Sequence, residues 1–389
     1  MPDGREPAAT LTIALVERID AIPAAEWDRL AGPDNPFVGH AFLRLLEESG
    51  SVGPKTGWEP RHLTARDAAG RLVGAVPLYL KGHSYGEYVF DHAWANAWER
   101  AGGEYYPKLQ AAVPFTPVTG PRLLTAADSP TGTAEAMAGA LRSIAGDNDL
   151  SSVHVTFPTE AEYDLLGRQG WLQRLGTQFH WENKGYAGFD DFLAGFASRK
   201  RKAVKKERRE VAESGVEVLT LTGADLKAEH WDAFYRFYTA TSDRKWGWAY
   251  LTEDFFHRLG QTMPDRVVLV MARDGGRWVA GALNLLGTDT LYGRNWGCAG
   301  DYRFLHFEAC YYRAIDFAIE RGLKRVEAGA QGQHKIQRGY LPVPTYSAHW
   351  IPNPGFRRAV AEFLAREREA MAEEMRLLAE ESPFRKDGD

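Results

Sequence analysis

Cysteine is scarce in this chain, which holds only Cys298 and Cys310 among its 389 residues. Their spacing fits neither a metal site nor a redox pair, so we expect no metal and no disulfide framework, and a reducing, cytoplasmic compartment. Long apolar runs are also missing, and none approaches the roughly 18 residues that a membrane-spanning helix needs. The N-terminal segment lacks the apolar core of a signal peptide, so we expect no transmembrane segment and no secretion.

The chain also lacks a large excess of either charge. Lys and Arg number 47 and Asp and Glu 52, a net charge of −5, so any attraction to phosphates must be local. The local exception is RKRKAVKKERR (199–209), with eight cations and one Glu. This segment could contact tRNA, the phosphates of CoA or an anionic lipid, with Lys205 and Arg209 as cofactor contacts, or it could be a solvated helix.

What the chain does contain is an internal repeat. The strings ARDAAGRLVGAVPLYL (65–80) and ARDGGRWVAGALNLL (272–286) both read as a hairpin with a tight Gly-Arg turn. A short amphipathic helix precedes each hairpin, and Tyr85 and Tyr292, each followed by Gly, should open the next strand. We interpret the pattern as two copies of one α+β unit; two unrelated hairpins with common turn chemistry are the alternative.

The coarse pattern assigns a domain to each copy. We expect a first domain at 1–188, a basic connecting helix at 189–215 and a second domain at 216–389. In the first domain, strands are expected near 11–16, 60–66, 71–81, 87–91, 152–157 and 172–182, with a helix near 160–169. In the second, helices are expected near 227–241, 252–262, 305–321 and 355–380, and strands near 216–221, 266–272, 277–287, 290–297, 323–328 and 344–351.

The order of these elements resembles the Gcn5-related acyltransferase fold, and two tandem copies joined by a basic helix resemble the Fem-type aminoacyltransferases. The strings GAQGQHKIQRG (329–339) and YYPKLQAAVPFTP (105–117) are similar to those of bacterial N-acyltransferases labelled as peptidoglycan biosynthesis or recognition proteins. The resemblance spans about 35–352. It implies two Gcn5-like domains, each a mixed, mostly antiparallel sheet flanked by helices, and acyl transfer to an amine. In that family the position of Gln333 is more often Glu. If that Glu were the general base, this chain would lack it, which argues against assigning the mechanism to this position.

The loop at 329–339 is the first candidate site. His334 is a candidate base because imidazole titrates near neutrality. Lys335 and Arg338 could hold an anionic group, and Gln331 and Gln333 could donate neutral hydrogen bonds. Two glycines, Gly329 and Gly332, would allow the backbone to approach a cofactor closely. An ordinary solvated polar loop is the alternative.

Other candidates lie on the neighbouring elements. Glu308 falls on an apolar helical stripe, where a carboxylate is either a candidate base or a partner of the helix dipole. Arg294 and Trp296 alternate on a strand and could bind substrate, or they could pack across the sheet. In the first domain, Asp91 is a second candidate base, and Tyr105 and Lys108 are candidate acceptor contacts. We read His180 and His306 as structural.

These observations predict an N-acyltransferase in which an amine attacks an activated acyl donor directly. No cofactor is expected to stay bound, because acyl-CoA or aminoacyl-tRNA would serve as co-substrate. The Gcn5-type pyrophosphate loop is not evident after 290–297, which favours the aminoacyl-tRNA alternative; the overall acidity does not. The acceptor would be an amine of a small molecule, a peptide or a cell-wall precursor. A non-catalytic binder of cell-wall fragments is the rival class, and the protein could be a monomer or a dimer.

Overall fold

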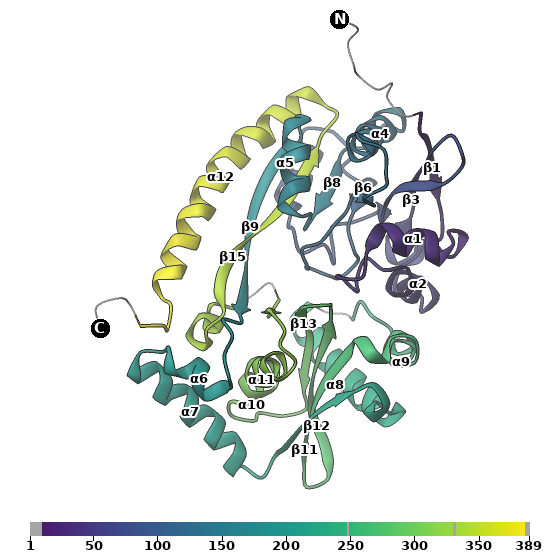
Figure 1. Cartoon of the computed structure of the whole chain (residues 1–389). Coiled ribbons are helices and arrows are strands. Elements are labelled where there is room, and N and C mark those ends of the chain that lie inside the picture. The colour runs from purple at the N-terminus through teal and green to yellow at the C-terminus, as the bar shows by residue number, and fades with distance from the viewer. Residues whose placement is uncertain (1–9, 247–248, 330–331, 386–389) are drawn as a thin grey trace, which may run out of the picture. The chain divides into compact units, whose positions relative to one another are not determined.

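The computed structural model describes residues 10–246, 249–329 and 332–385 (Figure 1). The chain folds into two compact units. Unit 1 comprises Met1–Gly176 and Thr345–Glu369, and unit 2 comprises Thr177–Pro344 and Ala370–Asp389. The chain therefore passes between the units more than once. The three-part division predicted from the sequence stays a prediction.

Unit 1 contains two sheets. The first has the order β1 (Thr12–Val16), β3 (His62–Arg66), β4 (Leu72–Val76) and β7 (Leu124–Thr125), all antiparallel. In the second, β2 (Trp58–Pro60) pairs with β5 (Leu78–Lys81), and β5 pairs with β6 (Lys108–Ala111). Next to β6 lies β8 (Val153–Thr156), which is parallel to it and pairs on its other side with the end of β15 (Leu341–Trp350).

Helices flank the sheets of unit 1. They are α1 (Ala24–Ala31), α2 (His40–Glu48), α3 (His92–Arg100), α4 (Thr133–Asp147) and α5 (Glu160–Arg168), with short 3-10 turns at η1 (Ile19–Ala21) and η2 (Pro54–Thr56). The core lies between α4 and the strands: Met137 and Leu141 of α4 pack with Leu63, Val76 and Val153. Burial of this apolar surface holds the unit together.

Unit 2 is built on one sheet. Its strands are β10 (Glu217–Thr222), β11 (Val267–Asp274), β12 (Arg277–Leu286), β13 (Thr290–Cys298), β14 (Arg325–Glu327) and the end of β9 (Leu172–Glu182), in that order. Every pairing is antiparallel except that of β13 with β14, which is parallel.

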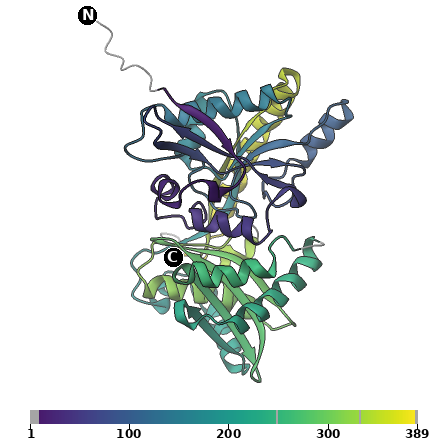
Figure 2. The same ribbon diagram turned by 90° about the vertical axis from the view of Figure 1, so that its right-hand side faces the viewer.

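The helices of unit 2 lie on both faces of its sheet (Figures 1 and 2). On one face lie α8 (Ala228–Trp246) and α9 (Glu253–Thr262). On the other lies a continuous helical stretch made of α10 (Leu305–Phe307), the π-helix η5 (Glu308–Tyr312) and α11 (Arg313–Glu320). The remaining elements are α6 (Phe189–Ala194), α7 (Ser198–Glu213) and the 3-10 turns η3 (Gly223–Asp225), η4 (Pro264–Arg266) and η6 (Gln333–Arg338). The long helix α12 (Pro354–Glu380) belongs to unit 1 up to Glu369 and to unit 2 from Ala370.

The predicted fold class is confirmed, and the two units repeat one element order. Each has a hairpin, a further strand, a helical stretch, and a strand that returns parallel to the previous one. The prediction of a strand at 87–91 is wrong. The chain forms a loop there, followed by the helix α3, before β6 begins. Pro77 splits the strand predicted at 71–81 into β4 and β5, and the connecting helix is two helices, α6 and α7. Within the described residues, no helix is long and apolar enough to cross a membrane.

Candidate active site

The two parallel strands of unit 2 separate soon after they pair. β13 pairs with β14 only from Thr290 to Tyr292, and β13 then continues to Cys298 alongside β12 alone. The register of β12 and β13 shifts between Leu283 and Asn284, where β13 carries Arg294 as an extra residue, and such a bulge bends the strand that carries it. The pairing therefore ends where β14 itself ends, at Glu327, and the loop at 328–339 begins.

Side chains at this point belong to two faces of the sheet. Leu291, Val326 and Trp181 pack into the core beneath α11. Because side chains alternate along a strand, Tyr292, Glu327 and His180 point to the opposite face. The end of β14 thus has an apolar side under the helices and a polar side opposite.

Glu327 is the most unusual residue of the polar side. Its side chain is buried, with 5% of the residue exposed, and its Oε2 atom has no hydrogen-bond partner. Burial raises the pKa of Glu327 to about 8, against the opposing charges of Arg325 and Arg294. A carboxyl group in this state exchanges its proton close to neutral pH, which is the property of a general base.

His180 lies beside this carboxyl group. Its Nε2 is 3.7 Å from Glu327 Oε2 and 3.4 Å from Oε1 of the buried Gln178. Burial, together with the charges of Arg325 and Lys335, lowers the pKa of His180 to about 3. The imidazole is therefore neutral at physiological pH and does not hold Glu327 in its ionised form.

The predicted loop residues lie on the 3-10 helix η6. His334 is exposed, and its Nε2 is 2.9 Å from the hydroxyl of Tyr311. Its ring lies 5.8 Å from that of His306 and 5.7 Å from that of Phe307. Since Tyr311 belongs to the core beneath α11, His334 stands on the helix side of the sheet, whereas Glu327 faces the other side.

Two predicted anion-binding residues of this loop are buried. Lys335 donates from Nζ to the carbonyl of Gly329 at 2.9 Å. Arg338 donates to the carbonyl of His334 at 2.8 Å and to Glu207 Oε1 at 2.7 Å, and its guanidinium lies 3.4 Å from the centre of the Phe307 ring. These contacts fold the loop onto itself and onto α7.

The glycines of the loop have positive φ angles, which are unfavourable for residues with a Cβ atom. Gly329 has φ 76° and Gly332 has φ 108°. A Cβ atom on Gly332 would lie 2.4 Å from the ring of His334. Gly332 therefore leaves room for the imidazole to fold back over the loop.

The remaining candidates of unit 2 are placed less centrally. Gln333 is exposed at the start of η6, and Gln331 lies outside the described residues. Trp296 is partly buried on the helix side, 5.3 Å from the ring of His306. Arg294 follows the point of strand separation, where its charge acts on Glu327.

Glu308 lies in the π-helix and is buried among cations. It accepts hydrogen bonds from Arg208 at 3.0 Å and from Arg313 at 3.0 Å. Arg208 also pairs with Asp316 at 2.6 Å. With both oxygens engaged by guanidinium groups, Glu308 fastens α7 to the helical stretch.

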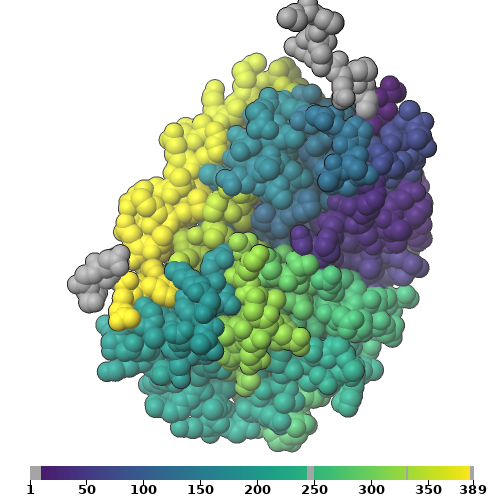
Figure 3. Space-filling model, viewed as in Figure 1, coloured from purple at the N-terminus to yellow at the C-terminus, as the bar shows by residue number. Residues whose placement is uncertain are grey.

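The basic helix α7 has one side that contacts η6 and another side that is exposed. Lys200 contacts Gln337, and Glu207 pairs with Arg338, so one side is fixed to η6. The other side is exposed and carries five cations: Arg199, Lys202, Lys205, Lys206 and Arg209. Three of them have acidic partners at distances of 2.7 to 3.9 Å. The teal segment of Figure 3 shows this part of the chain at the surface.

Unit 1 gathers three further predicted residues into one buried cluster. Lys108 Nζ lies 2.5 Å from Asp91 Oδ2 and 2.8 Å from Glu87 Oε2. Tyr105 donates its hydroxyl proton to the same Asp91 oxygen at 2.7 Å, and His154 Nε2 is 3.6 Å from it. The structure thus brings Asp91, Tyr105 and Lys108 together, within a different unit from the loop at 329–339.

The charges of this cluster are mutually compensated. Burial opposes ionisation of Asp91, but the charge of Lys108 outweighs it and holds the pKa of Asp91 below its usual range. Burial raises the pKa of Glu87 to about 7 and lowers that of Lys81, directly opposite Lys108 in the sheet, to about 7. A carboxylate held in its ionised form by a buried lysine is a poor proton acceptor, so Asp91 fits a structural role better than that of a base.

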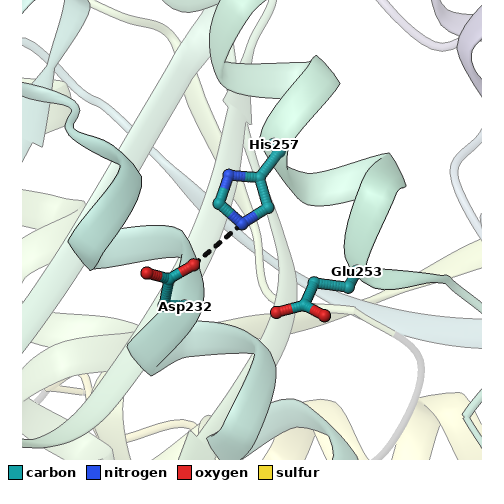
Figure 4. A group of neighbouring side chains, drawn as sticks. All are labelled: Asp232, Glu253 and His257. Atoms are coloured by element: carbon teal, nitrogen blue, oxygen red, sulfur yellow. Dashed lines mark ion pairs between the residues drawn. The ribbon is translucent and has the colours of Figure 1, made fainter.

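A group of metal-ligating side chains lies on α8 and α9 (Figure 4). His257 Nε2 is 2.9 Å from Asp232 Oδ1, and Glu253 stands one turn before His257, with one potential ligand atom from each residue within 4.8 Å of the others. All three are at least partly exposed. The ion pair between His257 and Asp232 is sufficient to account for the arrangement. The sequence predicted no metal site.

Sequence reasoning missed Glu327 and read His180 as structural. The signal for Glu327 was a carboxylate at the end of an otherwise apolar strand, directly before the glycine-rich loop. Its partner lies far away in the sequence, and only the pairing of β14 with β9 brings the two together.

Comparisons with known proteins bear on the family and the fold of the chain. A family model described as FemAB-like, peptidoglycan biosynthesis/recognition, matches residues 18–386. The structure of FemX is similar, with a TM-score of 0.55 and 12% identity over 87% of this chain and 98% of that one. L-PGS from Bacillus licheniformis has a TM-score of 0.50 and 10% identity over 82% and 95% of the two chains. No curated protein sequence matches at a significant level.

Proposed function

The chain belongs to the FemAB-like family of peptidoglycan biosynthesis and recognition proteins, and on that premise we propose that it is an N-acyltransferase with its active centre in unit 2. The centre lies where β13 and β14 separate. An amine of a small molecule, a peptide or a cell-wall precursor would attack the carbonyl carbon of an activated acyl group there.

This proposal rests on one observation, the buried carboxyl group of Glu327 with its raised pKa. An attacking amine must lose a proton, and a base titrating near the working pH does this best. The buried carboxylate accepts a proton from the substrate ammonium, and the amine nitrogen then bonds to the acyl carbon. The bond from that carbon to the thiol sulfur or ribose oxygen of the donor breaks, and the leaving group takes up a proton. Glu327 replaces His334 and Glu308 as the proposed base.

The neutral His180 supports this role. Because it is neutral, it adds no positive charge to those of Arg325 and Arg294, and such a charge would lower the pKa of the carboxyl group of Glu327. His334, held by Tyr311 on the helix side of the sheet, is better placed near the donor. With Trp296 and His306 it lines the helix side of the point where the strands separate.

The donor is an acyl-CoA or an aminoacyl-tRNA. We propose that its phosphates meet the exposed side of α7, with Lys205 and Arg209 among the contacts, because the opposite side of this helix is fixed to η6. α7 spans 16 residues, about 24 Å at 1.5 Å per residue. A stripe of that length fits the extended backbone of a tRNA better than the compact phosphates of CoA, which favours the aminoacyl-tRNA alternative. An anionic lipid surface would be attracted by the same charges.

The test is a transfer assay with both donors. The purified protein is incubated with muropeptides from digested peptidoglycan and either acetyl-CoA or bulk aminoacylated tRNA, and products are identified by mass. Transfer from one donor identifies the co-substrate, and a charge reversal at Lys202 should weaken use of tRNA more at low salt than at high salt. Muropeptide binding with no acylated product from either donor would instead support a non-catalytic cell-wall binder.

A further inference from the structure

A loop of unit 1 is fixed from beneath by the two buried lysines of β5 and β6. Lys108 donates from Nζ to Ser84 Oγ at 2.9 Å and to Glu87 at 2.8 Å. Lys81 donates to the carbonyl of Tyr85 at 3.3 Å. Both lysines are fully buried, so the hydrogen bonds that hold the loop at 82–91 from below are shielded from solvent.

The backbone around the exposed residues of this loop is also held. The indole of Trp58 donates to the Tyr85 carbonyl at 3.2 Å, and the amide of Phe115 donates to the Gly86 carbonyl at 3.2 Å. Further along, Arg174 donates to the Phe90 carbonyl at 2.8 Å. The positions of Tyr85 and Phe90 are therefore set by the fold.

Four rings of this segment form a row at the surface. Tyr85 is 45% exposed and Phe90 52% exposed, which makes them two of the few large hydrophobic side chains at the surface of the described chain. His92 lies between them, 5.8 Å from the ring of Tyr85 and 6.4 Å from that of Phe90, and His83 lies 5.2 Å from Tyr85. We call these four residues the aromatic row.

We propose that the aromatic row binds the sugar rings of an uncharged glycan, which makes unit 1 the part that recognises the acceptor. Exposed apolar side chains that gather in one patch mark binding sites, and a rigid backbone lowers the entropy cost of binding. The apolar face of a sugar ring can stack on Tyr85 and Phe90, while the imidazole of His92 and the phenol of Tyr85 offer hydrogen bonds to its hydroxyls.

The charges of the loop favour a neutral ligand over a nucleotide. Recognition of phosphate uses Lys, Arg or backbone N–H groups. The nearby Lys81 and Lys108 are buried and paired with Glu87 and Asp91, and Arg174 is paired with Glu367. The row itself contains no Lys, Arg, Asp or Glu. The assignment to an acceptor glycan rests on the proposed function, in which the acceptor is a cell-wall precursor.

The experiment is a calorimetric titration of the full chain with tetra-N-acetylchitotetraose. We expect binding to weaken about tenfold or more in Tyr85→Ala and in Phe90→Ala, because aromatic anchors dominate such interfaces. Phe363→Ala is the matched control, since Phe363 is 39% exposed elsewhere in unit 1 and should bind like the wild type. Tyr85→Phe retains the ring and should recover most of the affinity.

Uridine monophosphate is the competing probe. If it binds and the same two substitutions abolish its binding, the row is a nucleobase site and the glycan assignment is overturned. Failure of the glycan to bind, or equal binding by all variants, overturns it as well. Glu327→Gln should bind the glycan normally, so a loss of transfer with glycan binding intact would bear on the proposed active centre and not on the row.

Discussion

Replacing Glu327 with Gln should change how stability depends on pH. The folded-state pKa of Glu327 is raised from 4.5 to about 8, so the folded protein holds this proton over a range in which the unfolded chain releases it. The resulting stabilisation is fully present below the unfolded pKa and is lost as pH rises through about 8. Between pH 6 and pH 9 the loss is about 2.7 kcal/mol, from two pH units at about 1.36 kcal/mol each.

Gln has nearly the same shape and never ionises, so the variant should not show this loss. Differential scanning calorimetry at pH 6 and pH 9 measures the effect, and the difference between variant and wild type removes the contributions of all other groups. At about 2–4 °C per kcal/mol, the transition of unit 2 in Glu327→Gln should gain about 5–10 °C on the wild type between the two pH values. An equal shift of both proteins would refute the reasoning that burial keeps this carboxyl protonated.

Three further predictions concern contacts within each of the two units. Lys108→Met takes the shared cation from two buried carboxylates of unit 1, of which Asp91 loses its lysine and Glu87 keeps only Lys81 at 3.8 Å, and urea unfolding should show a loss of about 3–5 kcal/mol. Glu207→Gln removes the anion that holds Arg338, so transfer activity should fall at least about tenfold, whereas Glu210→Gln on the same helix should keep it. Gly297→Ala would place a Cβ atom 2.3 Å from the backbone of α8, and calorimetry should show unit 2 destabilised by at least about 1–3 kcal/mol.

The fold could be predicted because its pattern is local and occurs twice. The hairpin at 272–286 corresponds to β11 and β12, and the alternation that follows it corresponds to β13. The strand predicted at 87–91 does not form, and the reason is physical. Its alternating side chains, such as Glu87 and Asp91, point inward to meet buried lysines and not a sheet partner, and a short sequence window does not reveal those partners.

The candidate site could be predicted only in part. The glycines and cations of the loop at 329–339 indicated where in the sequence the candidate site lies. Which side chains could carry chemistry depended on burial. Lys335 and Arg338 turn inward to hold the loop, whereas Glu327, the last residue of β14, lacks a hydrogen bond at Oε2. These roles arise from strand pairing and ion pairs across long sequence separations, which residue types alone do not reveal.

The pH dependence of acyl transfer tests the central claim most directly. The rate of product formation is measured from pH 6 to pH 10 with the donor that supports transfer, for the wild type, Glu327→Gln and Glu217→Gln, in which an exposed carboxylate of the same sheet is changed. If Glu327 is the base, the wild-type rate rises with pH and levels off above about 8. Glu217→Gln follows it, and Glu327→Gln is slower by about 100-fold or more. Equal rates for Glu327→Gln and the wild type across this range would contradict the account.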